Sequence, residues 1–194
     1  LLPQMLKALL PVVGDYNISS LQLLAVGGAR VASDLLLQAR NAGLPVYEGY
    51  GLSECASVVA FNRVGADKPG TVGKPLPHVQ VRLNSDSELE VCGARFLGYL
   101  GDDVNEQVDV SSAPNADTTW LATGDLAHID DEGFLSIIGR KKNLLISSFG
   151  RNISPEWVES ELLAQAGILQ AAVFGEAKPV LSAVIFAPAL GEAA

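Results

Sequence analysis

Residues 48–54, with the sequence EGYGLSE, combine two glycines with groups able to hold a phosphorylated ligand. Glycines allow the backbone to approach a ligand closely because they have no Cβ. The hydroxyl of Ser53 can donate to a phosphate oxygen, and the carboxylate of Glu54 can bind Mg²⁺ beside it. The ring of Tyr50 offers a flat face to a base. Taken alone, the segment is a weak signal and favours a glycine-rich turn closed by an exposed Ser-Glu pair over a ligand site.

Three further segments carry polar groups that suit a nucleotide. Asp125 follows Thr123-Gly124, and an aspartate after a tight turn can accept two hydrogen bonds from a ribose diol, although Gly-Asp is also ordinary turn chemistry. Residues 140–142 form a basic triplet, which in isolation favours a solvated face. In residues 149–156, Gly150 marks either a close backbone approach or a turn before a helix.

The elements that would position these groups begin with a strand–helix–strand unit. Residues 21–26 are a compact apolar run typical of a buried strand, residues 45–50 are a second strand candidate, and residues 31–42 between them have helical spacing. Glycines follow both strands, at 27–28 and at 49–51. Such a unit predicts a parallel sheet that binds its ligand at the carboxyl ends of the strands.

A β-rich region follows. From 70 to 100 the chain is rich in glycine and proline, and residues 79–83 and 88–91 alternate apolar and polar side chains. This pattern predicts antiparallel strands in a small barrel or twisted sheet. Residues 101–118 are polar and acidic and are expected to loop over the surface, and residues 134–138 predict another strand.

The last part of the chain predicts a small α+β unit beyond a boundary near residues 141–143. A strand is expected at 144–146. Ser154 is a suitable N-cap for a helix that begins at a proline and ends before Gly167. Strands at 169–174 and 181–186 complete the unit.

Composition excludes several classes of function. The chain has 194 residues and a net charge of -9 without a basic cluster, so it is a poor candidate for nucleic-acid binding. No apolar run reaches the roughly 20 residues of a membrane span. Two separate cysteines, Cys55 and Cys92, suit neither a zinc site nor a disulfide scaffold, and a cytoplasmic location is therefore expected. The chain begins with Leu rather than Met, which favours a piece of a longer protein.

The order of short motifs along the chain carries a resemblance. Each motif alone is only modestly specific for a family, but their order along the chain is very specific. The motifs are residues 24–29 (LAVGGA), 50–54 (YGLSE), 70–75 (GTVGKP), 88–93 (ELEVCG), 98–99 (GY), 123–126 (TGDL), 133–134 (GF), 139–143 (GRKKN) and 153–159 (ISPEWVE). This series resembles the adenylate-forming superfamily, which contains acyl-CoA synthetases, peptide-synthetase adenylation domains and luciferases. The sequences of two motifs, residues 49–54 (GYGLSE) and 153–157 (ISPEW), are more similar to those of fatty acyl-CoA ligases than to those of peptide-synthetase domains.

The resemblance implies a fold and a domain organisation. It implies an α/β part followed by an α+β part. Residues 1–140 would be the C-terminal part of the large AMP-binding domain, with the strand–helix–strand unit at about 21–60 and the β-rich subdomain at about 70–138. Residues 141–194 would be a truncated small domain.

The resemblance also implies a reaction and a set of site residues. A carboxylate, such as a fatty acid, reacts with ATP to give an acyl-adenylate and pyrophosphate, and coenzyme A then displaces AMP. The adenine and ribose would lie against Gly28, Ala29, Arg30, Glu48, Gly49, Tyr50, Gly51, Asp125 and Arg140. Ser53 would contact the α-phosphate, and Glu54 would bind Mg²⁺.

The remaining implied roles concern the small domain. Asn143 lies at the expected hinge, where many family members have Asp. Phe149, Gly150 and Arg151 match a loop that lines the coenzyme A tunnel. The family's phosphate-gripping loop and its C-terminal lysine have no counterpart in residues 1–194, so these residues alone are expected to be inactive. Two alternatives stay open: an adenylation domain that loads a carrier protein, and a non-catalytic module that binds nucleotides or proteins.

Overall fold

The structure is a computed structural model that describes residues 1–93, 96 and 120–188. The Gly98-Tyr99 motif and the acidic loop expected at 101–118 lie outside these residues.

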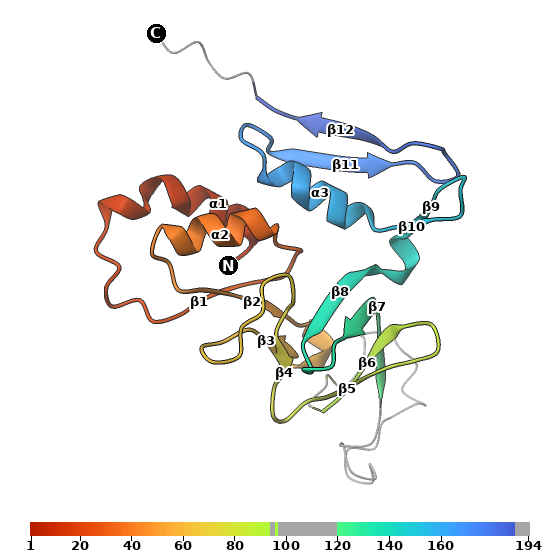
Figure 1. Cartoon of the computed structure of the whole chain (residues 1–194), viewed down its shortest axis with the longest axis horizontal. Helices are drawn as coiled ribbons and strands as arrows, with labels where there is room; N and C mark the ends of the chain where they lie inside the picture. Colours follow the sequence, from red (N-terminus) through yellow and green to blue (C-terminus); the bar gives the residue numbers. More distant parts are fainter. Residues whose placement is uncertain (94–95, 97–119, 189–194) are drawn as a thin grey trace.

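The chain begins with two short helices, α1 (Pro3–Leu9) and the 3-10 helix η1 (Leu10–Asp15) (Figure 1). The expected strand–helix–strand unit follows as β1 (Leu24–Val26), α2 (Ser33–Asn41) and β2 (Val46–Tyr50). β1 and β2 are parallel, with Leu24 opposite Val46. The strand predicted from residue 21 starts later, because the backbone N–H of Leu21 donates to the carbonyl of Ile18 in a turn.

The first sheet is mixed rather than wholly parallel. β3 (Ala60–Phe61) pairs antiparallel with β2, and β4 (Lys74–Pro75) pairs antiparallel with β3, in the order β1-β2-β3-β4. The short 3-10 helix η2 (Ser53–Cys55) lies in the connection from β2 to β3. The parallel prediction is therefore correct for the first strand pair and wrong for the rest of the sheet.

A first core forms between α1, α2 and β1–β2. The helical spacing predicted for α2 buries Leu35, Leu36 and Ala39 on one face, and these pack with Leu6 of α1 and Val46 of β2. Burial of these side chains holds both helices against the sheet.

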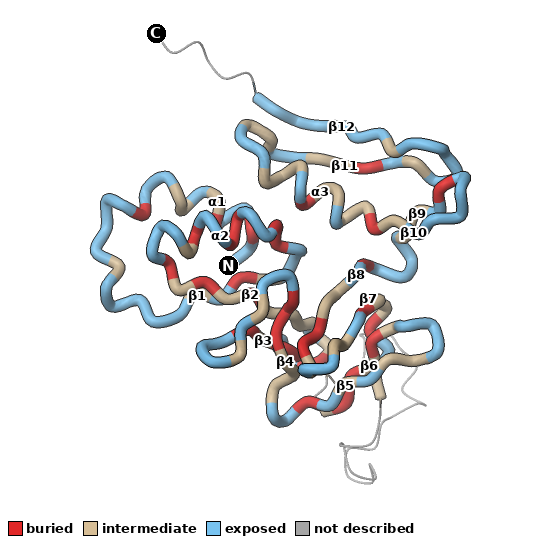
Figure 2. The backbone as a smooth tube through the Cα atoms, viewed as in Figure 1, coloured by how far each residue is buried: buried red, intermediate tan, exposed pale blue. Residues whose placement is uncertain are grey.

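The β-rich region is a second four-stranded sheet in which every neighbouring pair is antiparallel. It consists of β5 (Gln80–Leu83), β6 (Glu88–Cys92), β7 (Leu121–Ile129) and β8 (Leu135–Arg140), in that order. Its buried face contains Leu89, Val91, Ala127 and Leu135, and it packs against the end of the first sheet around Val59 (Figure 2). The expected antiparallel strands are confirmed within the described residues.

The small unit after β8 has the predicted order of elements. It contains η5 (Lys141–Asn143), β9 (Leu145–Ile146), β10 (Asn152–Ile153), α3 (Pro155–Ala164), β11 (Gln170–Phe174) and β12 (Ser182–Phe186). The hydroxyl of Ser154 accepts a hydrogen bond from the N–H of Trp157, as expected of an N-cap. β11 and β12 form an antiparallel pair of which α3 covers one strand (Figure 1).

No helix within the described ranges is both long and apolar enough to cross a lipid bilayer.

Candidate functional site

A cavity of about 720 Å³ lies where the first sheet, the second sheet and α3 meet. It is lined by the chain after β1, by the end of β2, by β7 and β8, and by residues of α1 and α3. Every residue predicted for the adenine and ribose wall is among the lining residues, namely Gly28, Ala29, Arg30, Glu48, Gly49, Tyr50, Gly51, Asp125 and Arg140. Segments more than a hundred residues apart in sequence thus meet at one site.

Asp125 is a buried acid of this cavity that is held from both sides. Its side chain is only 8% exposed, and each of its oxygens has a donor: Tyr50 Oη donates to Oδ2 at 2.5 Å, and Arg140 Nε lies 3.0 Å from Oδ1. Arg140 Nη1 also donates to the carbonyl of Thr123 at 2.8 Å. A carboxylate oxygen accepts about two hydrogen bonds. Each oxygen therefore keeps acceptor capacity for a ligand while its orientation is fixed.

The local backbone around Asp125 differs from the sequence prediction. Asp125 does not follow a tight turn but lies within β7, next to a register shift between Leu126 and Ala127. Gly124 has φ +75, and its N–H donates to the carboxylate of Glu88 on the neighbouring strand. An irregular strand of this kind re-aims a side chain, which here points into the cavity rather than lying on a regular sheet face.

Burial changes the acid–base properties of two further lining residues. Burial raises the pKa of Glu48 from 4.5 to about 7, against the opposing effects of a hydrogen bond from the Val31 backbone and the charges of Arg30 and Arg40. Burial and the hydrogen bond to Asp125 raise the pKa of the Tyr50 phenol. The phenol therefore stays protonated and remains a donor to the carboxylate.

Three glycines in or beside the cavity wall, Gly27, Gly49 and Gly51, are required by the chain's own packing. A Cβ at Gly51 would lie 1.5 Å from the carbonyl oxygen of Ser57, and one at Gly49 would lie 2.4 Å from the ring of Phe61. A Cβ at Gly27 would lie 2.6 Å from the carbonyl oxygen of Gly49. The sequence indicated close approach at these glycines, and the group that approaches them here is protein.

Ser53 and Glu54 follow Gly51 but are not among the cavity-lining residues. Ser53 is exposed at the start of η2, and the carbonyl of Glu54 accepts a hydrogen bond from the N–H of Phe96. Within the described part of the chain, no three His, Cys, Asp or Glu side chains gather as a metal cluster. Mg²⁺ commonly takes one or two carboxylates together with substrate phosphates, so a single carboxylate at Glu54 fits that ion.

The residues after β8 close one side of the cavity. Asn143 Nδ2 donates to Glu156 Oε1 at 2.6 Å, and the hydroxyl of Ser154 donates to Glu156 Oε2 at 2.9 Å. Burial raises the pKa of Glu156, but hydrogen bonds from Asn143 and Ser154 and the charge of Arg140 outweigh it, and the net pKa is lowered. Glu156 therefore stays ionised at the cavity edge.

The structure does not bring the residues implied for the coenzyme A tunnel to this cavity. Phe149, Gly150 and Arg151 lie in the turn between β9 and β10, and Phe149 is 74% exposed. The turn is closed by the carbonyl of Arg151, which accepts from the N–H of Ser147.

Sequence reasoning missed the part of the wall supplied by helices. Lys7 of α1 and Trp157 and Ser160 of α3 all line the cavity. No local pattern marks them, because each belongs to a short helix and reaches the site only through tertiary packing.

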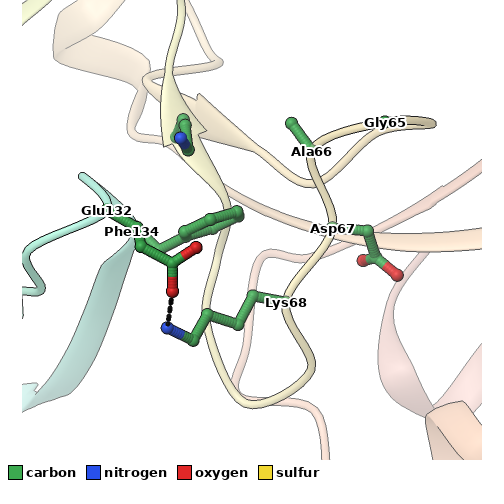
Figure 3. Close-up of a pocket in the computed structure, with 7 residues that line it drawn as sticks. Gly65, Ala66, Asp67, Lys68, Glu132 and Phe134 are labelled. Atoms are coloured by element: carbon green, nitrogen blue, oxygen red, sulfur yellow. Dashed lines mark hydrogen bonds and ion pairs between the residues drawn. The ribbon is translucent and has the colours of Figure 1, made fainter.

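A second hollow, of about 470 Å³, lies between the turn after β3 and the turn between β7 and β8 (Figure 3). Its lining side chains contact one another and hold the two turns together. Lys68 Nζ lies 2.7 Å from Asp130 Oδ2 and 2.8 Å from Glu132 Oε1. It also lies 5.5 Å from the centre of the Phe134 ring, and Lys74 Nζ lies 4.7 Å from the same centre. These contacts tie the turn after β3 to the β7–β8 hairpin.

Comparison with known proteins agrees with this geometry. The sequence profile of the AMP-binding enzyme family matches residues 1–100. The chain belongs to the AMP-binding enzyme family. Its relatives are CoA ligases, and its structural neighbours are adenylate-forming enzymes.

Two curated relatives illustrate the sequence similarity. This chain is 42% identical over 160 residues to the long-chain-fatty-acid–CoA ligase FadD15 of Mycobacterium bovis, and the match covers 82% of this chain and 26% of that protein. It is 34% identical over 173 residues to the 2-succinylbenzoate–CoA ligase of Bacillus velezensis, covering 82% of this chain and 34% of that protein. The chain thus spans about a quarter to a third of the length of these relatives.

Solved structures share the fold. O-succinylbenzoate coenzyme A synthetase from Bacillus subtilis in complex with ATP and magnesium superimposes with a TM-score of 0.74 at 29% identity, covering 95% of this chain and 40% of that one. The same enzyme in complex with AMP gives a TM-score of 0.74 at 30% identity, covering 97% of this chain and 41% of the other.

Proposed function

We propose that this AMP-binding family member holds the adenosine part of ATP, and of the acyl-adenylate made from it, within an ATP-dependent acyl-CoA ligase. The observation that carries the proposal is the buried Asp125 carboxylate. Tyr50 and Arg140 hold it from both sides, and it lines a cavity that residues 28–30, after β1, also line.

Each part of the cavity suits a part of adenosine. The ribose hydroxyls would donate to the free acceptor sites of Asp125. The base would lie between the backbone of residues 28–30 and the aromatic face of Tyr50, where stacking contributes more than simple burial. Arg140 keeps the carboxylate from turning away, so the ribose finds an acceptor already in place.

The phosphates would extend from this site toward Ser53 and Glu54. The hydroxyl of Ser53 is exposed and free to donate to an α-phosphate oxygen. Mg²⁺ held by Glu54 would neutralise phosphate charge during attack by the carboxylate substrate. FadD15 and the 2-succinylbenzoate ligases favour an organic acid as that substrate and coenzyme A as the acceptor, with a fatty acid supported by the higher identity.

Binding of AMP to residues 1–194, measured by isothermal titration calorimetry, tests the proposal. We expect Asp125→Asn to weaken AMP binding about 10- to 100-fold, because hydrogen bonds to a charged acceptor are worth roughly 1.5–3 kcal/mol. Asp131→Asn, an exposed acid on the β7–β8 turn, is the matched control and should leave the affinity unchanged. Equal AMP affinity in the two variants, with both folded by circular dichroism, would refute the assignment of Asp125.

A second measurement separates binding from chemistry. We expect residues 1–194 by themselves to give no ATP–pyrophosphate exchange, because the sequence contains no Ser, Thr and Gly-rich phosphate loop. Exchange above the level of an Asp125→Asn preparation, purified in parallel, would contradict this expectation.

A further inference from the structure

A single lysine joins the first helix of the chain to the last. Lys7 Nζ donates to the carbonyl of Leu163 at 2.5 Å, to that of Gln165 at 2.7 Å and to that of Ile168 at 3.2 Å. The three acceptors lie at the C-terminal end of α3 and in the turn that follows it. An ammonium group has three donors, and here all three are used on one helix end.

The end of α3 needs such a cation from elsewhere. The last carbonyls of a helix have no partner within the helix and carry partial negative charge, which a basic residue in the last turn usually offsets. The last turn of α3 contains no basic residue. Lys7, which is itself in the last turn of α1, supplies the missing charge from the other side of the cavity.

An apolar contact accompanies the polar one. Ala164, the last residue of α3, packs against the core cluster that contains Leu6 and Leu35. The C-terminal end of α3 therefore lies beside α1, as Figure 1 shows, while its N-terminal end is tied to η5 by the hydrogen bond from Asn143 to Glu156. Both ends of the helix are anchored.

α3 forms one wall of the cavity through Trp157, Ser160 and Leu163. We propose that Lys7 is a positioning residue that latches α3, and with it the small unit, over the nucleotide cavity. Because Lys7 is separated from α3 by more than 150 residues, it fixes the placement of the two units rather than the fold of either. The consequence for ligand affinity rests on the proposed function, whereas the latch itself does not.

The latch is tested by the distance between two spin labels. The labels are attached at Val64→Cys, between β3 and β4, and at Val184→Cys, on β12 of the small unit. Both valines are well exposed, whereas the native Cys55 and Cys92 are buried. In this background, Lys7→Met keeps the length of the side chain and removes the charge. We expect pulsed electron paramagnetic resonance to give one narrow distribution of label–label distances for the doubly labelled parent chain, and a broader distribution at longer distances for Lys7→Met.

Two control variants separate the latch from general destabilisation. Lys7→Arg should restore the narrow distribution, because it keeps the charge and the donors. Lys178→Met, a change at an exposed lysine of the small unit, should leave it unchanged. A parent-like distribution for Lys7→Met would overturn the latch, and so would broadening in all three variants.

AMP affinity provides the second readout. If removal of the latch lowers the closed population to about a third or a tenth, the Kd for AMP rises about three- to tenfold, because affinity scales with the competent fraction. Absence of AMP binding in the parent chain would contradict the proposed function but would leave the distance test of the latch intact. An unchanged Kd together with a broadened distribution would show that α3 does not contact the nucleotide, and would overturn the positioning role.

Discussion

At the scale of single residues, Asp125 depends on two donors, and Tyr50→Phe removes one of them while keeping the ring. The hydroxyl donates to Asp125 Oδ2 at 2.5 Å, and without it only Arg140 orients the carboxylate. We expect AMP affinity to fall about tenfold, equivalent to ~1.4 kcal/mol, near the lower end of a hydrogen bond to a charged group. Tyr16→Phe, at an exposed tyrosine, is the control for calorimetry. An affinity equal to that of the control would mean that the hydroxyl has no part in orienting Asp125.

Glu48 gives a prediction about pH. Its pKa is raised by burial from 4.5 to about 7, so between these values the folded chain binds more protons than the unfolded chain. The free energy of unfolding must then fall as pH rises from about 4.5 to 7, by about 3 kcal/mol at most, and the effect levels off above pH 7. Glu48→Gln stays neutral and lacks this contribution.

Urea denaturation of both proteins between pH 4.5 and 8 measures the effect. The difference in unfolding free energy between Glu48→Gln and the parent should shift in favour of the variant as pH rises, and other titrating groups cancel in that difference. A difference that is constant with pH would show that Glu48 titrates normally in the folded chain.

Which residues share the cavity could be expected at this scale only through the order of the motifs and the family resemblance that it carries. Residues 48–54 and the Asp125 segment taken singly indicated no more than ordinary turns, yet the cavity is lined by every residue that the resemblance implied for the adenine and ribose wall. The reason for the glycines could not be predicted, since the clash of a Gly51 Cβ with Ser57 depends on how the chain folds back after β2. The three bonds of Lys7 join residues more than 150 positions apart, which no local pattern encodes.

At the scale of elements, the return of the chain after β2 depends on Gly51. A Cβ there would lie 1.5 Å from the Ser57 carbonyl oxygen and 2.9 Å from the Val58 Cα, so backbone rather than a flexible side chain has to move. We expect Gly51→Ala to destabilise the chain by about 3 kcal/mol or more, because overpacking against backbone cannot relax by a rotamer change. Gly14→Ala is the matched control, since a Cβ at Gly14 meets nothing within 4 Å.

Thermal and urea unfolding of the two glycine variants measures this difference. Equal unfolding midpoints would show that the connection between η2 and β3 can shift without cost.

Element boundaries were predicted best where the signal is local. The Ser154 cap and the following proline indicated the start of α3 within a residue, whereas β1 starts three residues later than expected because a turn competes for Leu21.

At the scale of the whole molecule, the cavity is lined by both units, so a nucleotide that fills it must couple them. A ligand that binds only the folded state stabilises it by RT ln(1 + [L]/Kd), about 2.7 kcal/mol at a hundred times Kd. We expect AMP at this excess to raise the Tm and to slow amide hydrogen exchange in two places at once, at residues 28–30 and along α3. Inorganic phosphate at the same concentration should do neither, because it lacks the base and the ribose that are proposed to contact residues 28–30, Tyr50 and Asp125. Slower exchange confined to residues 28–30 would mean that the nucleotide binds only the part of the chain before η5. In that case α3 would lie near the site without forming its wall.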